Sequence, residues 1–163
     1  SSNRNFFTYE KLSGIEETAK NYFLKIEKNI QIWNFNGTVI DIGAHHGIFT
    51  IFAAFKGFNV LSYEPNPINF SILNKNLAEN NDLNIESINK AVSKKSEVVN
   101  FNMGKTSTTG ALVNSYRDWK RTDDNIEVQC SGINEILNHH DKVKILKIDC
   151  EGGEYEIFKK HTH

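Results

Sequence analysis

The chain has 163 residues, with 19 Lys and Arg against 20 Asp and Glu, and a formal net charge of −1. This length suits one domain with its own core, and the balanced charge offers no net field that would hold nucleic acid or an anionic membrane. The apolar runs fall far below the roughly 20 residues of a membrane-spanning helix, and no basic segment followed by an apolar one opens the chain. Two cysteines do not make a disulfide framework. We therefore expect a cytoplasmic chain with reduced thiols and no nucleic-acid partner.

The first half of the chain alternates between helical and strand patterns. Residues 9–30 place apolar side chains at helical spacing and predict a leading amphipathic helix. Short apolar runs then alternate with amphipathic stretches, and Gly57 and Pro67 mark a helix end and a helix start. The expected elements here are strands at 39–42 and 60–63 and helices at 47–55 and 67–80.

In the second half the alternation is interrupted by segments that read as additional strands. The expected elements are a third strand and its exit at 85–92, added strands at 97–103 and 126–130, a helix at 133–137, a strand at 143–148 and a helix at 154–159. Strands that alternate with helices at this spacing predict an α/β fold with a Rossmann-like, doubly wound parallel sheet, here with inserted strands.

The pattern also predicts how the chain is divided. We expect one domain over residues 1–163, in which a leading helical segment at 1–36 precedes a cofactor-binding α/β core at 37–163. Doubly wound cofactor domains usually carry more strands after this point, so the C-terminal part is expected to be truncated.

Polar residues and glycines gather where the expected strands end. Asp41, Gly43 and Gly47 follow the first strand, Glu64 ends the second, and Asp149 follows the apolar strand at 143–148. In open α/β sheets ligands bind beyond the carboxyl ends of the strands. A carboxylate in the position of Glu64 can accept hydrogen bonds from both hydroxyls of a ribose. The sequence therefore predicts a nucleoside-containing cofactor, and the change Glu64→Ala is expected to weaken its binding with little loss of fold.

The spacing of the glycines indicates which cofactor this is. Dinucleotide-binding enzymes typically show G-x-G-x-x-G, whereas this chain reads D-x-G-x-x-x-G, with His45 where the middle glycine would let a pyrophosphate approach. An acidic residue at the start of the turn, Asp41, suits a ligand that carries positive charge. S-adenosylmethionine combines a sulfonium, an ammonium and a ribose diol, so we predict it as the cofactor.

Three stretches resemble the motifs of the FkbM family of S-adenosylmethionine-dependent methyltransferases. They are VIDIGAHHGIFT at 39–50, YEPNPINF at 63–70 and ILKIDCEGGEYEIF at 145–158, and the loop STTGALV at 107–113 resembles a small-residue loop of that family. The resemblance implies a Rossmann-like methyltransferase that acts on a hydroxyl of a saccharide or another small natural product. The sequence leaves oligomerisation open, and its short apolar runs predict no membrane span.

The resemblance also implies roles for individual residues. It places Asp41, Gly43, Ala44 and Gly47 beside the methionine part of the cofactor, Glu64 on the ribose, Pro65 and Asn66 beside the adenosine, Ala91 and Val92 near the adenine, and Asp149 and Glu151 at the site of methyl transfer. Asp149, Glu151 and His45 are the candidates for the base that takes the acceptor's proton. The residues do not rank these three.

Other interpretations of the same residues remain open. A nicotinamide-dependent oxidoreductase fits the acidic end of the second strand but not the glycine spacing. A non-catalytic methyltransferase-like fragment fits the short C-terminus. We expect no metal, because adjacent histidines such as His45 and His46 should point in different directions and no ligand set accompanies them. Cys150 is expected to fill space and not to act as a nucleophile, since methyl transfer needs no covalent enzyme intermediate.

Overall fold

The computed structural model describes residues 36–104, 111–112, 124–140, 142–150 and 153–158. The helix predicted at 9–30 and most of the loop at 107–113 lie outside these residues. Within the described part, no helix is long and apolar enough to cross a bilayer. Cys130 and Cys150 are both free thiols.

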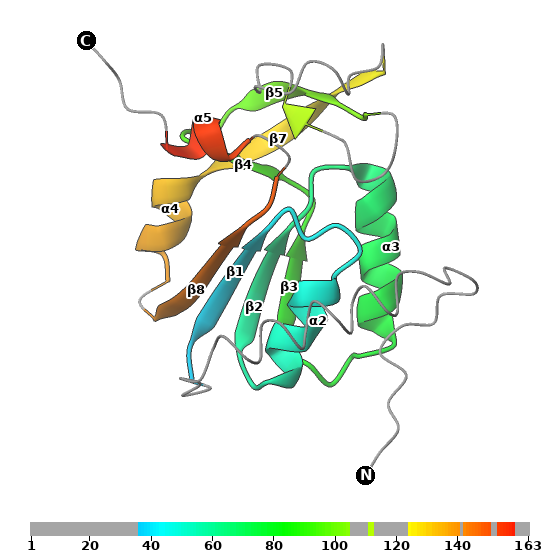
Figure 1. Cartoon of the computed structure of the whole chain (residues 1–163), viewed down its shortest axis with the longest axis vertical. Coiled ribbons are helices and arrows are strands. Elements are labelled where there is room, and N and C mark those ends of the chain that lie inside the picture. Colours follow the sequence, from blue (N-terminus) through cyan, green and yellow to red (C-terminus); the bar gives the residue numbers. More distant parts are fainter. Residues whose placement is uncertain (1–35, 105–110, 113–123, 141, 151–152, 159–163) are drawn as a thin grey trace.

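A four-stranded parallel sheet forms the centre of the molecule (Figure 1). Its strands are β1 (Thr38–Ile42), β2 (Asn59–Tyr63), β3 (Ile85–Ile88) and β8 (Val143–Ile148), in the order β3-β2-β1-β8. All three pairings are parallel, so the carboxyl ends of the strands meet at one edge of the sheet. This confirms the predicted parallel core.

Helices cover both faces of this sheet, as a doubly wound fold requires. On one face α2 (Ile48–Phe55) packs against β1, β2 and β3, and α3 (Pro67–Ala78) packs beside it against β3 (Figure 1). On the other face α4 (Ile133–Asn138) and α5 (Glu154–Phe158) contribute buried isoleucines to a core shared with β1 and β2. The near-continuous apolar strands predicted from the sequence are those of a sheet buried between helices.

A second, mixed sheet lies beyond the carboxyl ends of the parallel strands (Figure 1). It contains β4 (Ala91–Ser93), β5 (Val98–Asn102), β6 (Ala111–Leu112) and β7 (Asn125–Gly132), in the order β4-β7-β5-β6. The added strands were expected within the alternating sheet, and the structure instead gives them a sheet of their own. Val92 joins this sheet to the first, because it packs in the same core cluster as strands β1 and β2.

The third strand predicted in 85–92 is β3, and its predicted exit contains a further strand, β4, in the other sheet. β3 pairs with β2, whereas β4 pairs in parallel with β7. The break falls at Asn89, whose side-chain amide donates to the carbonyl oxygens of Glu64 and Pro65 at 2.7 and 3.2 Å. The hydrogen bonds from Asn89 to the turn after β2 thus change the direction of the chain, and Ala91 and Val92 join the second sheet.

Capping residues fix where the two helices beside the site begin. Gly47, at φ 89°, precedes α2, and the helix ends at Lys56 before Gly57, at φ 95°, as predicted. Asn66 caps α3, because its side-chain oxygen accepts the N–H groups of Ile68 and Asn69 at 2.9 and 3.3 Å. Pro67 follows as the first helical residue.

Candidate active site

The turn after β1, residues 43–47, uses its backbone donors inside the protein. The N–H groups of Gly43 and Ala44 both donate to the carbonyl oxygen of Tyr63, at 2.9 and 3.0 Å, and that of Gly47 donates to the Ala44 oxygen at 2.9 Å. The N–H of His45 is engaged by a buried carboxylate. A diphosphate needs such donors for itself. The turn therefore does not suit a dinucleotide, in agreement with the glycine spacing.

Packing alone requires both glycines of this turn. Gly43 has φ 77°, and a Cβ at this position would lie 2.0 Å from the carbonyl oxygen of Asp149. Gly47 has φ 89°, and a Cβ there would lie 2.5 Å from Leu73 Cδ1. Positive φ and close approach both favour glycine. The two glycines therefore define the shape of the turn whether or not a ligand approaches it.

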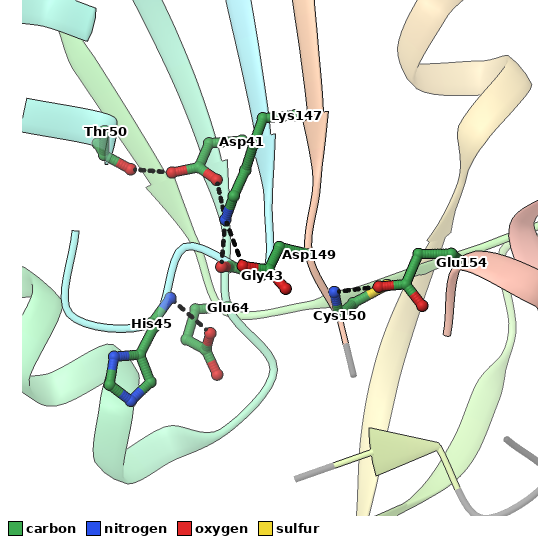
Figure 2. A network of polar contacts seen from close by, with 9 residues as sticks. All are labelled: Asp41, Gly43, His45, Thr50, Glu64, Lys147, Asp149, Cys150 and Glu154. Atoms are coloured by element: carbon green, nitrogen blue, oxygen red, sulfur yellow. Dashed lines mark hydrogen bonds and ion pairs between the residues drawn. The ribbon is translucent and has the colours of Figure 1, made fainter. Parts of the chain in front are cut away.

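Glu64 lies at the end of β2 and is 5% exposed. Its Oε1 accepts the N–H of Asn66 at 2.9 Å. Its Oε2 accepts the N–H of His45 at 2.8 Å (Figure 2). Burial raises the pKa of this carboxyl, and the hydrogen bonds from Asn66, His45 and Asn69 lower it in part. Glu64 thus ties the first turn to the cap of α3. A carboxylate oxygen has two lone pairs, so these bonds leave acceptor capacity for a ligand.

Asp41 is fully buried, and partners within the protein surround its carboxylate. The Thr50 hydroxyl donates to Oδ2 at 2.7 Å. Lys147 Nζ lies 3.0 Å from Oδ1, as an ion pair without the direction of a good hydrogen bond (Figure 2). The charge that the sequence interpretation offered to a positively charged cofactor is therefore already balanced by Lys147, and the contact of Asp41 with the methionine part stays a prediction.

Asp149 follows β8 and carries an exposed carboxylate beside the same turn. Its side chain is 68% exposed, and its Oδ2 lies 4.0 Å from Lys147 Nζ. The backbone N–H of Asp149 donates to the Ile42 oxygen at 3.0 Å, which places the residue next to Gly43. Glu151, the other acidic candidate from this motif, lies outside the described residues. Among the three candidate bases, Asp149 thus presents an exposed carboxylate beside the turn, and its role as a base stays a prediction.

The imidazole of His45 is directed elsewhere. Its ring stacks on that of His46 with centroids 3.7 Å apart and planes at 27°, so the expectation that the two side chains point in different directions was wrong. The left-handed backbone of His45, at φ 53°, accompanies this arrangement. In Figure 2 the His45 ring points away from Asp149. Among the described residues, no group of three or more His, Cys, Asp or Glu side chains is placed to hold a metal ion.

A small hollow of about 20 Å³ opens between the turn and the second sheet. Its lining is mostly apolar and comprises Ile42, Gly43, Tyr63, Pro65, Lys90, Ala91, Val92, Phe101, Cys150 and Gly153. Three residues predicted to surround the adenosine therefore meet here, namely Pro65, Ala91 and Val92. The side chain of Asn66 instead caps α3.

A carboxylate at the start of α5 closes the loop after β8. The Glu154 carboxylate accepts the backbone N–H of Cys150 at 2.8 Å (Figure 2). Burial and the nearby Glu154 raise the pKa of the Cys150 thiol well above its ordinary value. The thiol therefore stays protonated at neutral pH, as a space-filling residue would.

Sequence reasoning gave no role to Lys147, although it belongs to the motif quoted at 145–158. A signal was present: Asp41 is the lone charge in the strand TVIDI, and Lys147 is a charge of opposite sign in the strand VKILKI, which also contains Lys144. Only the pairing of these strands shows that the two residues are direct neighbours in register.

The hydrogen-bonding groups of the site fit S-adenosylmethionine. Glu64 and Asp149 stand at the ends of β2 and β8 and can accept hydrogen bonds from hydroxyl and ammonium groups. An apolar hollow adjoins the turn, whose N–H groups at 43–45 are already bonded. A doubly wound sheet with these features at its carboxyl edge defines a nucleoside-cofactor-binding domain.

Comparison with known proteins agrees. Residues 41–162 match the methyltransferase FkbM domain, and the chain belongs to this family. It is therefore an S-adenosylmethionine-dependent methyltransferase. No curated protein matches the chain. Among solved structures it is similar to a protein from Listeria monocytogenes assigned as an S-adenosylmethionine-dependent methyltransferase, with 12% identity over 75% of this chain and 81% of that chain and a TM-score of 0.36.

Proposed function

We propose that the chain methylates a hydroxyl oxygen of a saccharide or another small natural product. The observation that carries this proposal is the position of Asp149, an exposed carboxylate beside the cofactor turn. A hydroxyl is a weak nucleophile until a base takes its proton. A carboxylate open to solvent at this edge of the sheet can receive that proton from a bound acceptor. Glu151 follows in the same motif and remains a second candidate.

Within this proposal, each part of the cofactor has a place. The turn at Asp41, Gly43, Ala44 and Gly47 borders the methionine part, Glu64 binds the ribose hydroxyls, and Pro65, Asn66, Ala91 and Val92 surround the adenosine. Pro65, Ala91 and Val92 line one small hollow beside the turn, which supports placing these three residues on the same side of the adenosine. The buried carboxylate at the end of β2 supports the placement of the ribose.

S-adenosylmethionine supplies a methyl group on a positively charged sulfur, which an oxygen can attack in line. With the cofactor held at the carboxyl edge of the sheet, Asp149 would take the proton of the acceptor hydroxyl, and the bound cofactor would supply the methyl group to that oxygen. The protein contributes mainly by holding the two reactants in line, an effect that can supply on the order of 7–11 kcal/mol. Asp149 adds proton removal to this positioning.

We further propose that residues 1–163 act as one domain. Support comes from the core that joins the two sheets, since Val92 of β4 packs with Ile42 and Tyr63 of the parallel sheet. A shared core makes the sheets a single folding unit.

Titration calorimetry on Glu64→Ala tests the cofactor site. We expect the wild-type chain to bind S-adenosylhomocysteine but not NAD, and the variant to bind S-adenosylhomocysteine at least about tenfold more weakly, since charged hydrogen bonds to the ribose are lost. The change is also expected to destabilise the fold, contrary to the view from sequence. The N–H groups of His45 and Asn66 lose their acceptor, at about 1–3 kcal/mol for each donor left buried.

A matched control separates these effects. Glu79→Ala removes an exposed carboxylate at the far end of α3 and should leave both affinity and stability unchanged. Equal affinity of wild type and Glu64→Ala for S-adenosylhomocysteine would refute the ribose role of Glu64.

A further inference from the structure

The ammonium group of Lys147 lies where three parts of the site converge. Nζ is 3.0 Å from Asp41 Oδ1, donates to the carbonyl oxygen of Gly43 at 2.9 Å and lies 4.0 Å from Asp149 Oδ2 (Figure 2). One cation thus contacts the end of β1, the turn that follows it and the first residue after β8.

Strand register places the ammonium there. Asp41 and Lys147 are direct partners in the parallel pair β1 and β8, so their side chains leave the same face of the sheet. Lys147 is 16% exposed, and Asp41 is fully buried. A buried carboxylate needs an opposite charge, and the Thr50 hydroxyl supplies only a neutral donor.

The contact with Gly43 goes beyond charge balance. The Gly43 carbonyl belongs to the turn that is expected to border the cofactor, and Lys147 bonds it across 104 residues of sequence. An ammonium can direct three N–H groups from one point. The same group therefore fixes the direction of the turn and the spacing between the turn and Asp149.

We propose that Lys147 is a positioning residue, which preforms the cofactor turn through the Gly43 carbonyl and holds the Asp149 carboxylate beside it. This role rests on the proposed cofactor site. A methionine at position 147 keeps most of the volume but has no donor. An arginine keeps the charge but spreads its donors over a planar fork, which does not reproduce one compact ammonium that faces the Asp41, Gly43 and Asp149 oxygens.

Two variants and one control test the proposal by titration calorimetry with S-adenosylhomocysteine, below the unfolding temperature of each protein. Lys147→Met should bind about tenfold to hundredfold more weakly, the range expected when a charge-assisted hydrogen bond supporting the site is lost. Lys147→Arg retains a cation for Asp41 and should remain folded, with an affinity still reduced several-fold. Partial unfolding also weakens apparent binding, because the apparent Kd is the intrinsic Kd divided by the folded fraction. Urea denaturation of each variant gives this fraction, and the corrected Kd values are compared.

The control is Thr50→Val, which removes the other partner of Asp41 at similar volume and leaves the Gly43 carbonyl bonded. It should lower the unfolding temperature and change the affinity by less than about twofold, because the turn keeps its support. A loss of affinity equal to that of Lys147→Met would overturn the proposal, since any loosening around Asp41 would then suffice. Wild-type affinity in Lys147→Arg would also overturn it, because charge alone would explain the residue.

The wild-type titration separates this role from the cofactor site itself. Binding by wild type with unchanged affinity in Lys147→Met refutes the positioning role alone. Failure of the folded wild-type chain to bind S-adenosylhomocysteine would overturn the cofactor site, and the role of Lys147 with it.

Discussion

Replacing Gly43 with alanine should destabilise the protein more than any ordinary glycine substitution. The backbone at Gly43 has φ 77°, which costs an L-residue about 1–2 kcal/mol. The new Cβ would also lie 2.0 Å from the carbonyl oxygen of Asp149. Backbone cannot rotate away as a side chain can, so β1 and β8 must separate at their carboxyl ends, at a further cost of about 1–3 kcal/mol for overpacking. The expected loss is about 2–5 kcal/mol.

Urea denaturation followed by circular dichroism measures this loss, and thermal unfolding should fall by roughly 4–20 °C for a chain of this size. Gly47→Ala is the matched control, because it carries the same kind of positive φ but meets the flexible end of Leu73. It should cost only about 1–3 kcal/mol. If Gly43→Ala is no less stable than Gly47→Ala, the close approach between the turn and Asp149 does not constrain the fold, and the reasoning fails.

Two further predictions concern ionisation. Burial raises the pKa of Glu64 above its ordinary 4.5, so lowering the pH through the raised value should weaken binding of S-adenosylhomocysteine, as the carboxylate gains a proton. The stability of the unliganded protein should change in the opposite direction. The contribution of Glu64 to the free energy of unfolding is full below the ordinary pKa and is lost as the pH rises through the raised pKa. As the pH rises, the affinity measured by calorimetry should therefore increase and the free energy of unfolding measured in urea should decrease. Both trends should vanish in Glu64→Gln. If they persist in that variant, another group causes them. Burial raises the pKa of Cys130 to about 11 and that of Cys150 further, so iodoacetamide at neutral pH should modify neither thiol in the native protein, and rapid modification of Cys150 would contradict its protonated state.

Local sequence patterns predicted a feature correctly where that feature depends on the residues of a single helix or strand. The strand at 143–148 has the predicted bounds, because its apolar residues pack on both faces of the sheet, Ile145 on one face and Leu146 and Ile148 on the other. The start of α3 was predicted from Pro67, and the structure adds the cap by Asn66. The leading helix and Glu151 lie outside the described residues and stay predictions.

Contacts between residues far apart in the sequence could not be predicted from local patterns. Residues 85–92 were expected to hold a third strand and its exit, and the pairing of that exit in another sheet was not predicted, because β-propensity does not indicate to which sheet a residue belongs. The division follows from Asn89 bonding the turn after β2, and from the pairing of Ala91 with Cys130. The stacking of His45 on His46 likewise depends on a left-handed backbone that the spacing of residues does not reveal.

By itself the sequence determined the class of fold, the edge of the sheet at which the site lies and the family, because periodicity, turn residues and short motifs are properties of neighbouring residues. The tertiary structure alone decided what the acidic residues do there. It buried Asp41 against Lys147, bonded both oxygens of Glu64 to backbone and left Asp149 exposed. These differences arise from strand register and burial, which bring together groups far apart in the chain and so set the charge that each can offer to a ligand.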